Sequence, residues 1–526
     1  VSKVSESFNI LWNFQFDSLT VWFMGLFLGI DAVLVLIQLC KLFIFKLCLY
    51  ILHYLGGRKF YNTKMMNIPN MGSLSFVPLS HKRTQKNKYS TLRDTGLASQ
   101  SDIVDTNGLP IDSTFLQWFA GFTDAEGNFI INSLKNTKLC EASLRPKFSF
   151  MFKIALHKDD KTVLNYIKDK LRIGGVRYYK DECIFNITDK KGIALLISIF
   201  DKYNLNTTKH LDFLDFKEAF YIYLNRENIS NTALISSVKE KILDLKNQMN
   251  TNRVNFDRPQ NSPIVITKNW LLGFIEGDGS FFIRRDNLTP IFAIEITGVQ
   301  LPVLVQIKEF LENSLGFDKY SLFKLKNSSI IAVTTNKARN NSRSSVSFII
   351  SNISVLNNYF IPLFNETEFL TKKGKDFKDF KTICKIIYKG AHRKEDIRSL
   401  ILKLANTMNN FRLSTNKEKV QFLTNKEMDL LLNASPTIER LLDGRVIDSD
   451  TKKILPKLNS CVYEIVGERG EQYLANSLSE AALIVNLYPD TLSRHLDIEV
   501  LNLEEAYIEV KAYKVRRVRV FNISEI

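Results

Sequence analysis

The chain has 526 residues, of which 45% are hydrophobic and 24% are charged. A chain of this length is too long for one ordinary core, so it predicts two to four folded units. Lysine and arginine number 71 against 55 aspartate and glutamate, which gives a formal charge of +16. This excess favours a polyanionic partner, either nucleic acid or an anionic membrane surface, although a basic protein without such a partner has the same charge.

The cysteines and histidines exclude several kinds of site. The six cysteines are scattered and form no C-x-x-C pair, and the six histidines are scattered as well. This pattern argues against a disulfide framework and a structural zinc site, and it favours a reducing compartment. A catalytic metal would then need oxygen ligands, which is typical of Mg²⁺ or another hard cation such as Mn²⁺.

Residues 1–80 are predicted to be an apolar leader. Residues 19–40 are long enough to span a bilayer, but Asp31 interrupts them, and a second apolar run at 42–55 is shorter. Membrane association through 19–55 is therefore one expectation. The string WNFQFDSLTV at 12–21 resembles a stretch of subunit 5 of mitochondrial NADH dehydrogenase, and the chain begins with Val. An intron reading frame fused to its upstream exon would look like this, so the other expectation is an exon-derived leader on a mitochondrial protein.

Polar residues dominate 81–112, which predicts a flexible linker. Beyond it the chain repeats itself. WFAGFTDAEGNFII at 118–131 recurs as WLLGFIEGDGSFFI at 270–283, and a second echo relates 206–216 to 369–380. Two echoes in the same order indicate a duplicated α/β unit.

Alternating apolar residues between the echoes predict strands. From Phe148 to Leu156, every second residue is apolar, which indicates a strand with one face buried under helices. The other face is basic or small and suits a nucleic-acid groove, although an ordinary solvated face has the same pattern. The predicted DNA-binding residues of the two halves are Arg145, Lys147, Ser149, Arg284 and Arg285.

The two motif segments, FAGFTDAEG at 119–127 and LLGFIEGDG at 271–279, resemble the LAGLIDADG homing endonucleases. The resemblance covers about residues 114–412 and is to the single-chain form, in which two copies do the work of a homodimer. It implies two pseudo-symmetric αββαββα halves that form a DNA-binding saddle, within a monomeric pseudo-dimer.

The spacing of small residues supports close packing of the two motif helices. Gly121 and Ala125 lie four residues apart on one helical face, as do Gly273 and Gly277. Small residues at this spacing let two helix backbones approach closely. The glycine that ends each motif is expected to stop its helix before a strand.

Two carboxylates, Glu126 and Asp278, are predicted to meet at the ends of the motif helices. Like charges at close range need a bridging cation or proton, and divalent metals could also activate a water for phosphodiester hydrolysis. By resemblance, these acids are the metal ligands, and the carbonyls of Ala125 and Gly277 are auxiliary ligands. The neighbouring acids Asp124 and Glu276 are expected to be structural.

Three lysines complete the site by resemblance. Lys209 and Lys373 match the position where the family has a lysine near the scissile phosphate. Lys153 falls on the strand where relatives often carry a glutamine that orients water, and Glu295 is the best candidate for its counterpart in the second half.

The C-terminal region carries a candidate DNA-binding module. Residues 462–496 predict a hairpin and two short helices, with Ser477 or Ser479 capping the first helix and Asp490 the second. This segment resembles a helix-turn-helix of the modular DNA-binding repeats appended to intron-encoded nucleases. Its predicted DNA contacts are Thr491, Ser493 and Arg494, and the basic strand at 511–521 could contact phosphates.

The whole sequence predicts an α/β protein that cuts duplex DNA at an intron insertion site. The predicted divisions are a leader (1–80), a flexible linker (81–112), the first LAGLIDADG domain (113–250), an inter-domain linker (251–265), the second LAGLIDADG domain (266–412), a helical linker (413–460) and the DNA-binding module (461–526). The main alternative is an RNA-binding maturase that assists splicing of its own intron, and a second is a membrane protein whose leader is its purpose. An intein is not expected, because the chain neither begins with Cys or Ser nor ends in His-Asn.

Overall fold

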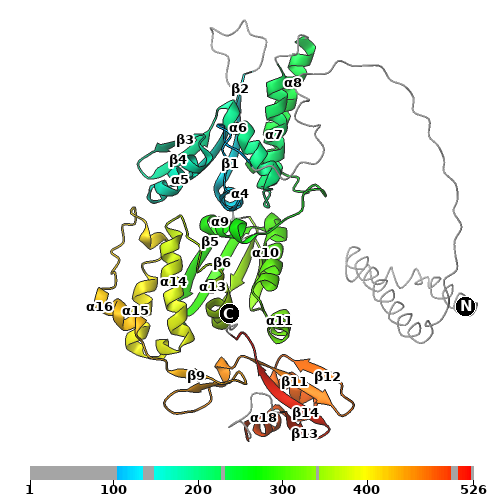
Figure 1. The fold of residues 1–526 in the computed structure, drawn as a ribbon, viewed down its shortest axis with the longest axis vertical. Coiled ribbons are helices and arrows are strands. Elements are labelled where there is room, and N and C mark those ends of the chain that lie inside the picture. The colour runs from blue at the N-terminus through cyan, green and yellow to red at the C-terminus, as the bar shows by residue number, and fades with distance from the viewer. Residues whose placement is uncertain (1–102, 134–146, 227–231, 339–342, 499–506, 523–526) are drawn as a thin grey trace, which may run out of the picture. The chain divides into compact units, whose positions relative to one another are not determined.

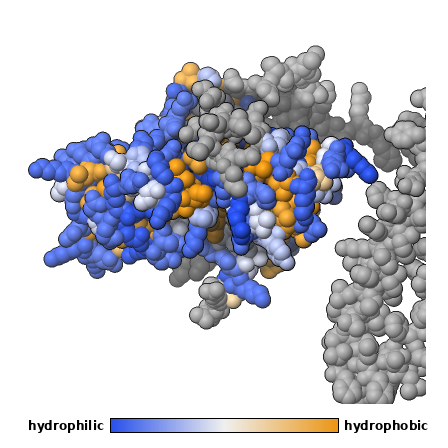
Figure 2. Space-filling view, turned by 90° about the horizontal axis from the view of Figure 1, so that it is seen from below, coloured by the Kyte–Doolittle hydropathy of each residue, from blue (hydrophilic) through white to orange (hydrophobic). Residues whose placement is uncertain are grey.

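The computed structural model describes residues 103–133, 147–226, 232–338, 343–498 and 507–522. The leader at 19–55 and Arg145 lie outside these residues. Within the described ranges, no helix is long and apolar enough to cross a membrane. Figure 2 shows one face of the molecule, where hydrophilic residues predominate and smaller hydrophobic areas lie between them.

The first half follows the order αββαββα and adds two helices. Its elements are α4 (Ser113–Glu126), β1 (Gly127–Ser133), β2 (Phe148–His157), α5 (Lys161–Leu171), β3 (Gly175–Tyr178), β4 (Glu182–Ile187), α6 (Lys190–Lys202), α7 (Lys209–Asn225) and α8 (Thr232–Gln248). The strands form one antiparallel sheet in the order β1-β2-β4-β3.

The second half repeats this order with one extra helix, α11, before its third strand. Its elements are α9 (Lys268–Asp278), β5 (Gly279–Arg284), β6 (Thr289–Thr297), α10 (Leu301–Ser314), α11 (Lys319–Lys326), β7 (Ile331–Asn336), β8 (Ser345–Ile350), α12 (Ile353–Val355), a π-helical turn (Leu356–Phe360), α13 (Ile361–Leu363), α14 (Lys373–Tyr388) and α15 (Glu395–Ala405). The sheet order β5-β6-β8-β7 matches that of the first half. The predicted α/β fold with two pseudo-symmetric halves is confirmed.

Helices bury one face of each sheet. Along β2 the side chains alternate between buried and partly exposed from Phe148 to Ala155, as the sequence predicted. The buried side chains of the first sheet pack against aromatic residues of α6 and α7, such as Phe200 and Phe216. The opposite face of the sheet, which carries Ser149 and Lys153, is left partly exposed.

The two halves meet at α4 and α9, which lie against each other (Figure 1). A Cβ atom added at Gly121 would lie 1.9 Å from the carbonyl oxygen of Trp270, and one at Gly273 would lie 2.1 Å from that of Trp118. At the C-terminal ends of the helices, a Cβ on Gly277 would lie 2.2 Å from the Ala125 Cβ. These contacts leave no room for side chains, so the helix backbones cross in direct contact.

The end of the predicted flexible linker is folded. Val104 and Pro110 form a β-bridge, and Asp105 pairs with Arg172 of the first half at 2.5 Å. The prediction of a flexible linker is therefore wrong for residues 103–112, because a local turn and an ion pair hold them to the domain.

The C-terminal part continues from the second half. It contains α16 (Asn425–Leu432), β9 (Ile438–Arg440), β10 (Val446–Asp448), β11 (Cys461–Gly467), β12 (Gln472–Ala475), α17 (Leu478–Ile484), α18 (Pro489–Ile498), β13 (Ile508–Val510) and β14 (Tyr513–Arg519). The last four strands form a sheet in the order β12-β11-β14-β13, and α17 and α18 cover it. Ser477 caps α17, whereas Asp490 lies inside the first turn of α18 and does not precede it.

Candidate functional site

Two carboxylates end the motif helices. Glu126 is the last residue of α4, and Asp278 is the last residue of α9. A Cβ placed on Gly277 would lie only 3.4 Å from Glu126 Oε1, so the absence of a side chain at position 277 admits this carboxylate to the end of the opposite helix. Both carboxylates are partly buried, and neither has a hydrogen-bond or ion-pair partner among the described residues.

Burial and mutual repulsion make this pair electrostatically costly. Burial raises the pKa of Glu126, and the nearby Asp278 carboxylate raises it further. Burial also raises the pKa of Asp278, although Lys209 and Lys373 act in the opposite direction. An acidic pair that is desolvated and not hydrogen-bonded is the arrangement that a cation stabilises.

Lys209 and Lys373, which come from the second repeated segment, also lie at the ends of the motif helices. Lys209 Nζ donates to the carbonyl oxygens of Thr123 at 3.3 Å and Ala125 at 2.5 Å. Lys373 Nζ donates to those of Gly277 at 2.8 Å and Gly279 at 2.5 Å. Burial lowers the pKa of both lysines. Each ammonium group therefore neutralises the C-terminal end of a motif helix beside the carboxylates.

The acids two residues earlier, Asp124 and Glu276, have a structural role. Asp124 accepts hydrogen bonds from the backbone N–H groups of Asn206 and Thr207 at 2.7 and 2.9 Å, and from Trp270 Nε1 at 2.9 Å. Glu276 accepts from the N–H groups of Leu370 and Thr371 at 3.0 and 2.6 Å. Each acid thus holds the segment that leads into a lysine-bearing helix.

Two residues that the sequence did not single out fix the same helices from the opposite half. Asp160 accepts from the N–H of Lys372 at 2.8 Å, just before Lys373. Gln300 accepts from the N–H of Thr208 at 3.0 Å, just before Lys209, and donates to its Oγ1 at 2.7 Å. The two lysines are therefore positioned by contacts that cross between the halves.

A third repeated segment relates the two halves, and the sequence analysis did not identify it. Asn250 and Asn409 adopt left-handed φ values of 56° and 58°, and their side chains donate to carbonyls of β1 and β5 at 3.0 and 2.9 Å. Arg253 and Arg412 follow three residues later and pair with acids of α7 and α14. The shared pattern Met-Asn-x-x-Arg at 249–253 and 408–412 was the available signal.

The strand register corrects one pairing of residues between the halves. Ile154 pairs with Gly127 on β1, and Ile294 pairs with Gly279 on β5, so these two isoleucines are equivalent. The counterpart of Lys153 is therefore Ala293, and the prediction of Glu295 was wrong. Lys153 is partly exposed on β2, whereas Glu295 accepts a hydrogen bond from Ser345 at 2.6 Å.

The predicted DNA contacts occupy several surfaces. Ser149 lies on the outer face of β2, Lys147 precedes that strand and is exposed, and Arg284 and Arg285 are exposed at the end of β5. On α18, Arg494 is exposed, and Ser493 Oγ donates to Asp497 Oδ2 at 3.1 Å.

The basic C-terminal strand differs from the expectation that it contacts phosphates. β14 lies inside its sheet between β11 and β13. Arg516 pairs with Glu464 at 2.6 Å, and Arg517 pairs with Asp497 at 2.7 Å. These guanidinium groups are engaged within the protein, where they hold the sheet and α18 together.

The donor set fits a divalent metal in part. Among the described residues, no cluster of three or more His, Cys, Asp or Glu side chains could hold a metal ion. The oxygen donors that converge are the carboxylates of Glu126 and Asp278 and the carbonyls of Ala125 and Gly277. The lysines bond these two carbonyls, so the carboxylates are the donors that remain available.

Comparison with known proteins agrees with this geometry. A family model described as LAGLIDADG endonuclease matches residues 119–220 and 271–384. The probable intron-encoded endonuclease Cox1-I1b of Schizosaccharomyces pombe is 33% identical over 213 residues, which cover 39% of this chain and 51% of that protein. The uncharacterized mitochondrial protein RF1 of Saccharomyces cerevisiae is 25% identical over 322 residues. These residues cover 59% of this chain and 62% of RF1.

The matched region thus spans between half and two thirds of these two relatives. Among solved structures, the LAGLIDADG homing endonuclease I-GzeII in complex with its DNA target is 26% identical, with a TM-score of 0.46 over 56% of this chain and 99% of that one. The family match falls on the two segments that carry the facing helices, the carboxylates and the lysines. These two segments of the chain are therefore similar to the LAGLIDADG endonuclease family.

Proposed function

We propose that the protein is a site-specific endonuclease that hydrolyses one phosphodiester on each strand of a duplex DNA target, as expected for intron homing. The observation that carries this proposal is the pair of Glu126 and Asp278. They are partly buried, have no hydrogen-bond partner among the described residues, and lie where two helix ends cross. The match to the LAGLIDADG endonuclease family model and the similarity to an intron-encoded relative support the same conclusion.

Glu126 and Asp278 would hold divalent cations, for which Mg²⁺ or Mn²⁺ fits the oxygen donors. A bound cation would supply charge stabilisation at the phosphate and activation of a water. Lys209 and Lys373 hold positive charge beside the carboxylates, where a phosphate oxygen gains charge during hydrolysis.

The outer faces of the two sheets would bind the duplex. Basic and polar side chains such as Lys147, Ser149 and Arg284 would contact phosphates and base edges. The α17–α18 module would add a further DNA contact through Thr491 and Arg494, with α18 held in place by Asp497 bonds to Arg445 and Arg517. The name of the relative RF1, a mitochondrial protein of Saccharomyces cerevisiae, supports a mitochondrial location.

The test is cleavage of DNA that spans the joined exons flanking the parent intron, with the purified chain and Mg²⁺. Discrete cutting near the exon junction, abolished in Glu126→Gln and in Asp278→Asn variants, is the expected result. Tight DNA binding without cutting under several divalent metals would overturn the proposal. Stimulation of splicing by both variants would then favour the maturase alternative.

A further inference from the structure

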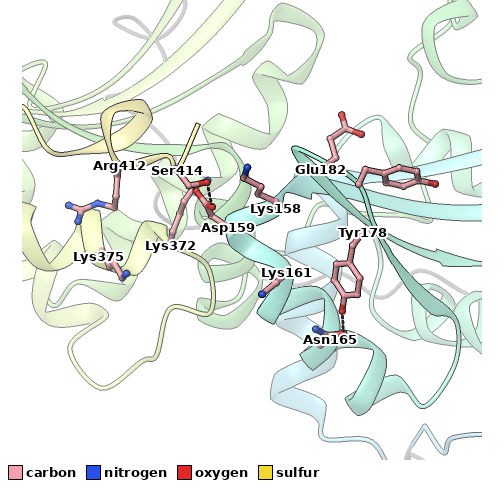
Figure 3. Close-up of a pocket in the computed structure, with 11 residues that line it drawn as sticks. Lys158, Asp159, Lys161, Asn165, Tyr178, Glu182, Lys372, Lys375, Arg412 and Ser414 are labelled. Atoms are coloured by element: carbon pink, nitrogen blue, oxygen red, sulfur yellow. Dashed lines mark hydrogen bonds between the residues drawn. The ribbon is translucent and has the colours of Figure 1, made fainter. Parts of the chain in front are cut away.

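A second cavity, of about 920 Å³, lies beside the carboxylate site and is lined by both halves (Figure 3). The first half contributes Lys158 and Lys161, and the second half contributes Lys372, Lys375 and Arg412. We call these five residues the basic flank. They face only two acids in the lining, Asp159 and Glu182. The cavity also shares Lys372 and Glu182 with the pocket that contains Glu126, so the two sites are neighbours.

Three of the five cations already have partners. Lys158 pairs with Asp181 at 3.2 Å, Lys372 pairs with Asp160 at 3.2 Å, and Arg412 pairs with the acids of α14. Lys161 and Lys375 are exposed and have no ion-pair partner within the described ranges. Two uncompensated ammonium groups, one from each half, therefore face the same cavity, as Figure 3 shows.

The protein holds the walls of this cavity in place. Ser414 donates from its backbone N–H and its hydroxyl to Asp159 at 2.8 and 2.5 Å, which ties the chain after Arg412 to the first half. On the opposite wall, Tyr178 donates its hydroxyl to Asn165 at 2.9 Å. The cations therefore line a cavity whose walls are held in place by hydrogen bonds.

The pseudo-symmetric position on the other side of the molecule is lined mainly by apolar residues instead of lysines. Equivalent registers place Leu301 where the first half has Lys161, Val305 where it has Asn165, and Leu211 where the second half has Lys375. There the inter-domain linker, through Pro259, Pro263 and Ile264, lines a pocket with Leu301 and Val305. One flank of the pseudo-twofold axis therefore has a cavity with five cations, whereas the pocket beneath the linker on the other flank is lined mainly by apolar residues, with Arg258 as its one charged residue.

We propose that the basic flank binds the phosphate backbone of the target DNA on one side of the cut, off the pseudo-twofold axis. This inference rests on the proposed function, because it takes the duplex to lie over Glu126 and Asp278. Phosphates next to the scissile group would then reach a neighbouring cavity that offers two free ammonium groups. A phosphodiester backbone is the ligand chemistry that a lysine and arginine cavity with few acids selects.

The experiment measures DNA affinity of the full chain as a function of salt, with the joined-exon duplex and Ca²⁺ present to limit cutting. The test variant is Lys161→Gln/Lys375→Gln. The matched control is Lys239→Gln/Lys426→Gln, which removes two exposed lysines from α8 and α16, helices packed behind α7 and α14. Each lost phosphate contact lowers the slope of log affinity against log salt by about 0.9. The test variant should therefore lose about 2 in slope, while the control keeps the parent slope.

The outcomes separate this inference from the proposed function. A slope and an affinity equal to those of the control would overturn it, even if the parent protein cuts its target. A loss seen only with an RNA of the same length would also overturn it, because the ligand would then be RNA. Failure of the parent protein to bind or cut any duplex would instead count against the proposed function itself.

Discussion

The indole Nε1 of Trp118 lies 3.0 Å from Glu276 Oε1, so the first motif helix is bonded to an acid of the second. Glu276 also accepts from the backbone N–H groups of Leu370 and Thr371. Replacing Glu276 with Ala leaves one buried donor and two partly buried donors without their acceptor, and each such loss costs about 1–3 kcal/mol. We expect Glu276→Ala to lower the free energy of unfolding by at least about 3 kcal/mol.

Urea unfolding of the variant and its parent measures this effect. The control is Glu240→Ala, which removes an exposed acid of α8. Equal midpoints for the two variants would show that the bonds of Glu276 do not hold the halves together.

Substitution of the carboxylate pair should separate catalysis from stability. Burial raises the pKa of Glu126 and Asp278, so ionising them costs folding free energy. We expect Glu126→Gln and Asp278→Asn to reduce cleavage by at least about a thousandfold while leaving the free energy of unfolding unchanged or raised by about 1 kcal/mol. Single-turnover cleavage and urea unfolding of the same preparations check both parts. A variant that loses activity and stability together would argue that the acid is structural.

The helix crossing should tolerate no added atom. An alanine at position 121 would bring its Cβ to 1.9 Å from the carbonyl oxygen of Trp270, which is backbone and cannot turn away. We expect Gly121→Ala to force the halves apart and to lower the free energy of unfolding by roughly 3 kcal/mol or more. Gly175→Ala is the matched control, because the nearest atom to its added Cβ lies 3.9 Å away. Thermal unfolding compares them, and equal melting temperatures would contradict the tight crossing.

The difference between Lys153 and Ala293 predicts unequal cutting of the two strands. These residues are equivalent by register, but only the first half carries a cation at this strand position. We expect Lys153→Ala to slow the cutting of one strand by about 10- to 100-fold and to leave the other within about twofold. End-labelled duplex, with each strand followed separately, measures the two rates. Equal slowing of both strands would mean that Lys153 acts on the site as a whole.

Buried His210 should make stability depend on pH. Burial lowers its pKa to about 4, and its Nε2 lies 2.8 Å from Ser262 Oγ. An unfolded histidine titrates near 6.5, so the unfolded state binds a proton first as the pH falls. Stability is therefore full above about pH 6.5 and falls by about 3 kcal/mol as the pH drops to about 4. Urea unfolding at pH 7 and pH 5 should show a smaller loss for His210→Gln, and equal losses would exclude this role.

The sequence predicted the features that local spacing determines. The glycines of α4 and α9, the alternation along β2 and the paired lysines all follow from short-range patterns. The closing glycines end their helices before a strand, as expected. Gly127 has an extended φ of −72°, and a Cβ there would lie 2.5 Å from the Thr123 side chain. Close packing, and not a left-handed turn, selects this residue.

The strand register and the contacts between the halves could not be predicted from the sequence. The repeats are offset by 152 residues at the tryptophans of the motifs but by 140 at Ile154 and Ile294, because the connection between the first two strands is shorter in the second half. Counting along the chain therefore missed the equivalence of Lys153 and Ala293, which strand register alone establishes. Asp160 and Gln300 were missed because their partners lie in the opposite half.

The contacts of Asp160 and Gln300 also mean that the duplicated halves are no longer interchangeable. Asp160 provides a carboxylate for the ammonium of Lys372, whereas Gln300 provides an amide that both accepts from and donates to Thr208. A homodimer of the first half would set Asp160 against a threonine, and one of the second half would set Gln300 against an unpaired lysine. Divergence at these two positions has made each half complementary only to the other half, so neither half can replace its partner.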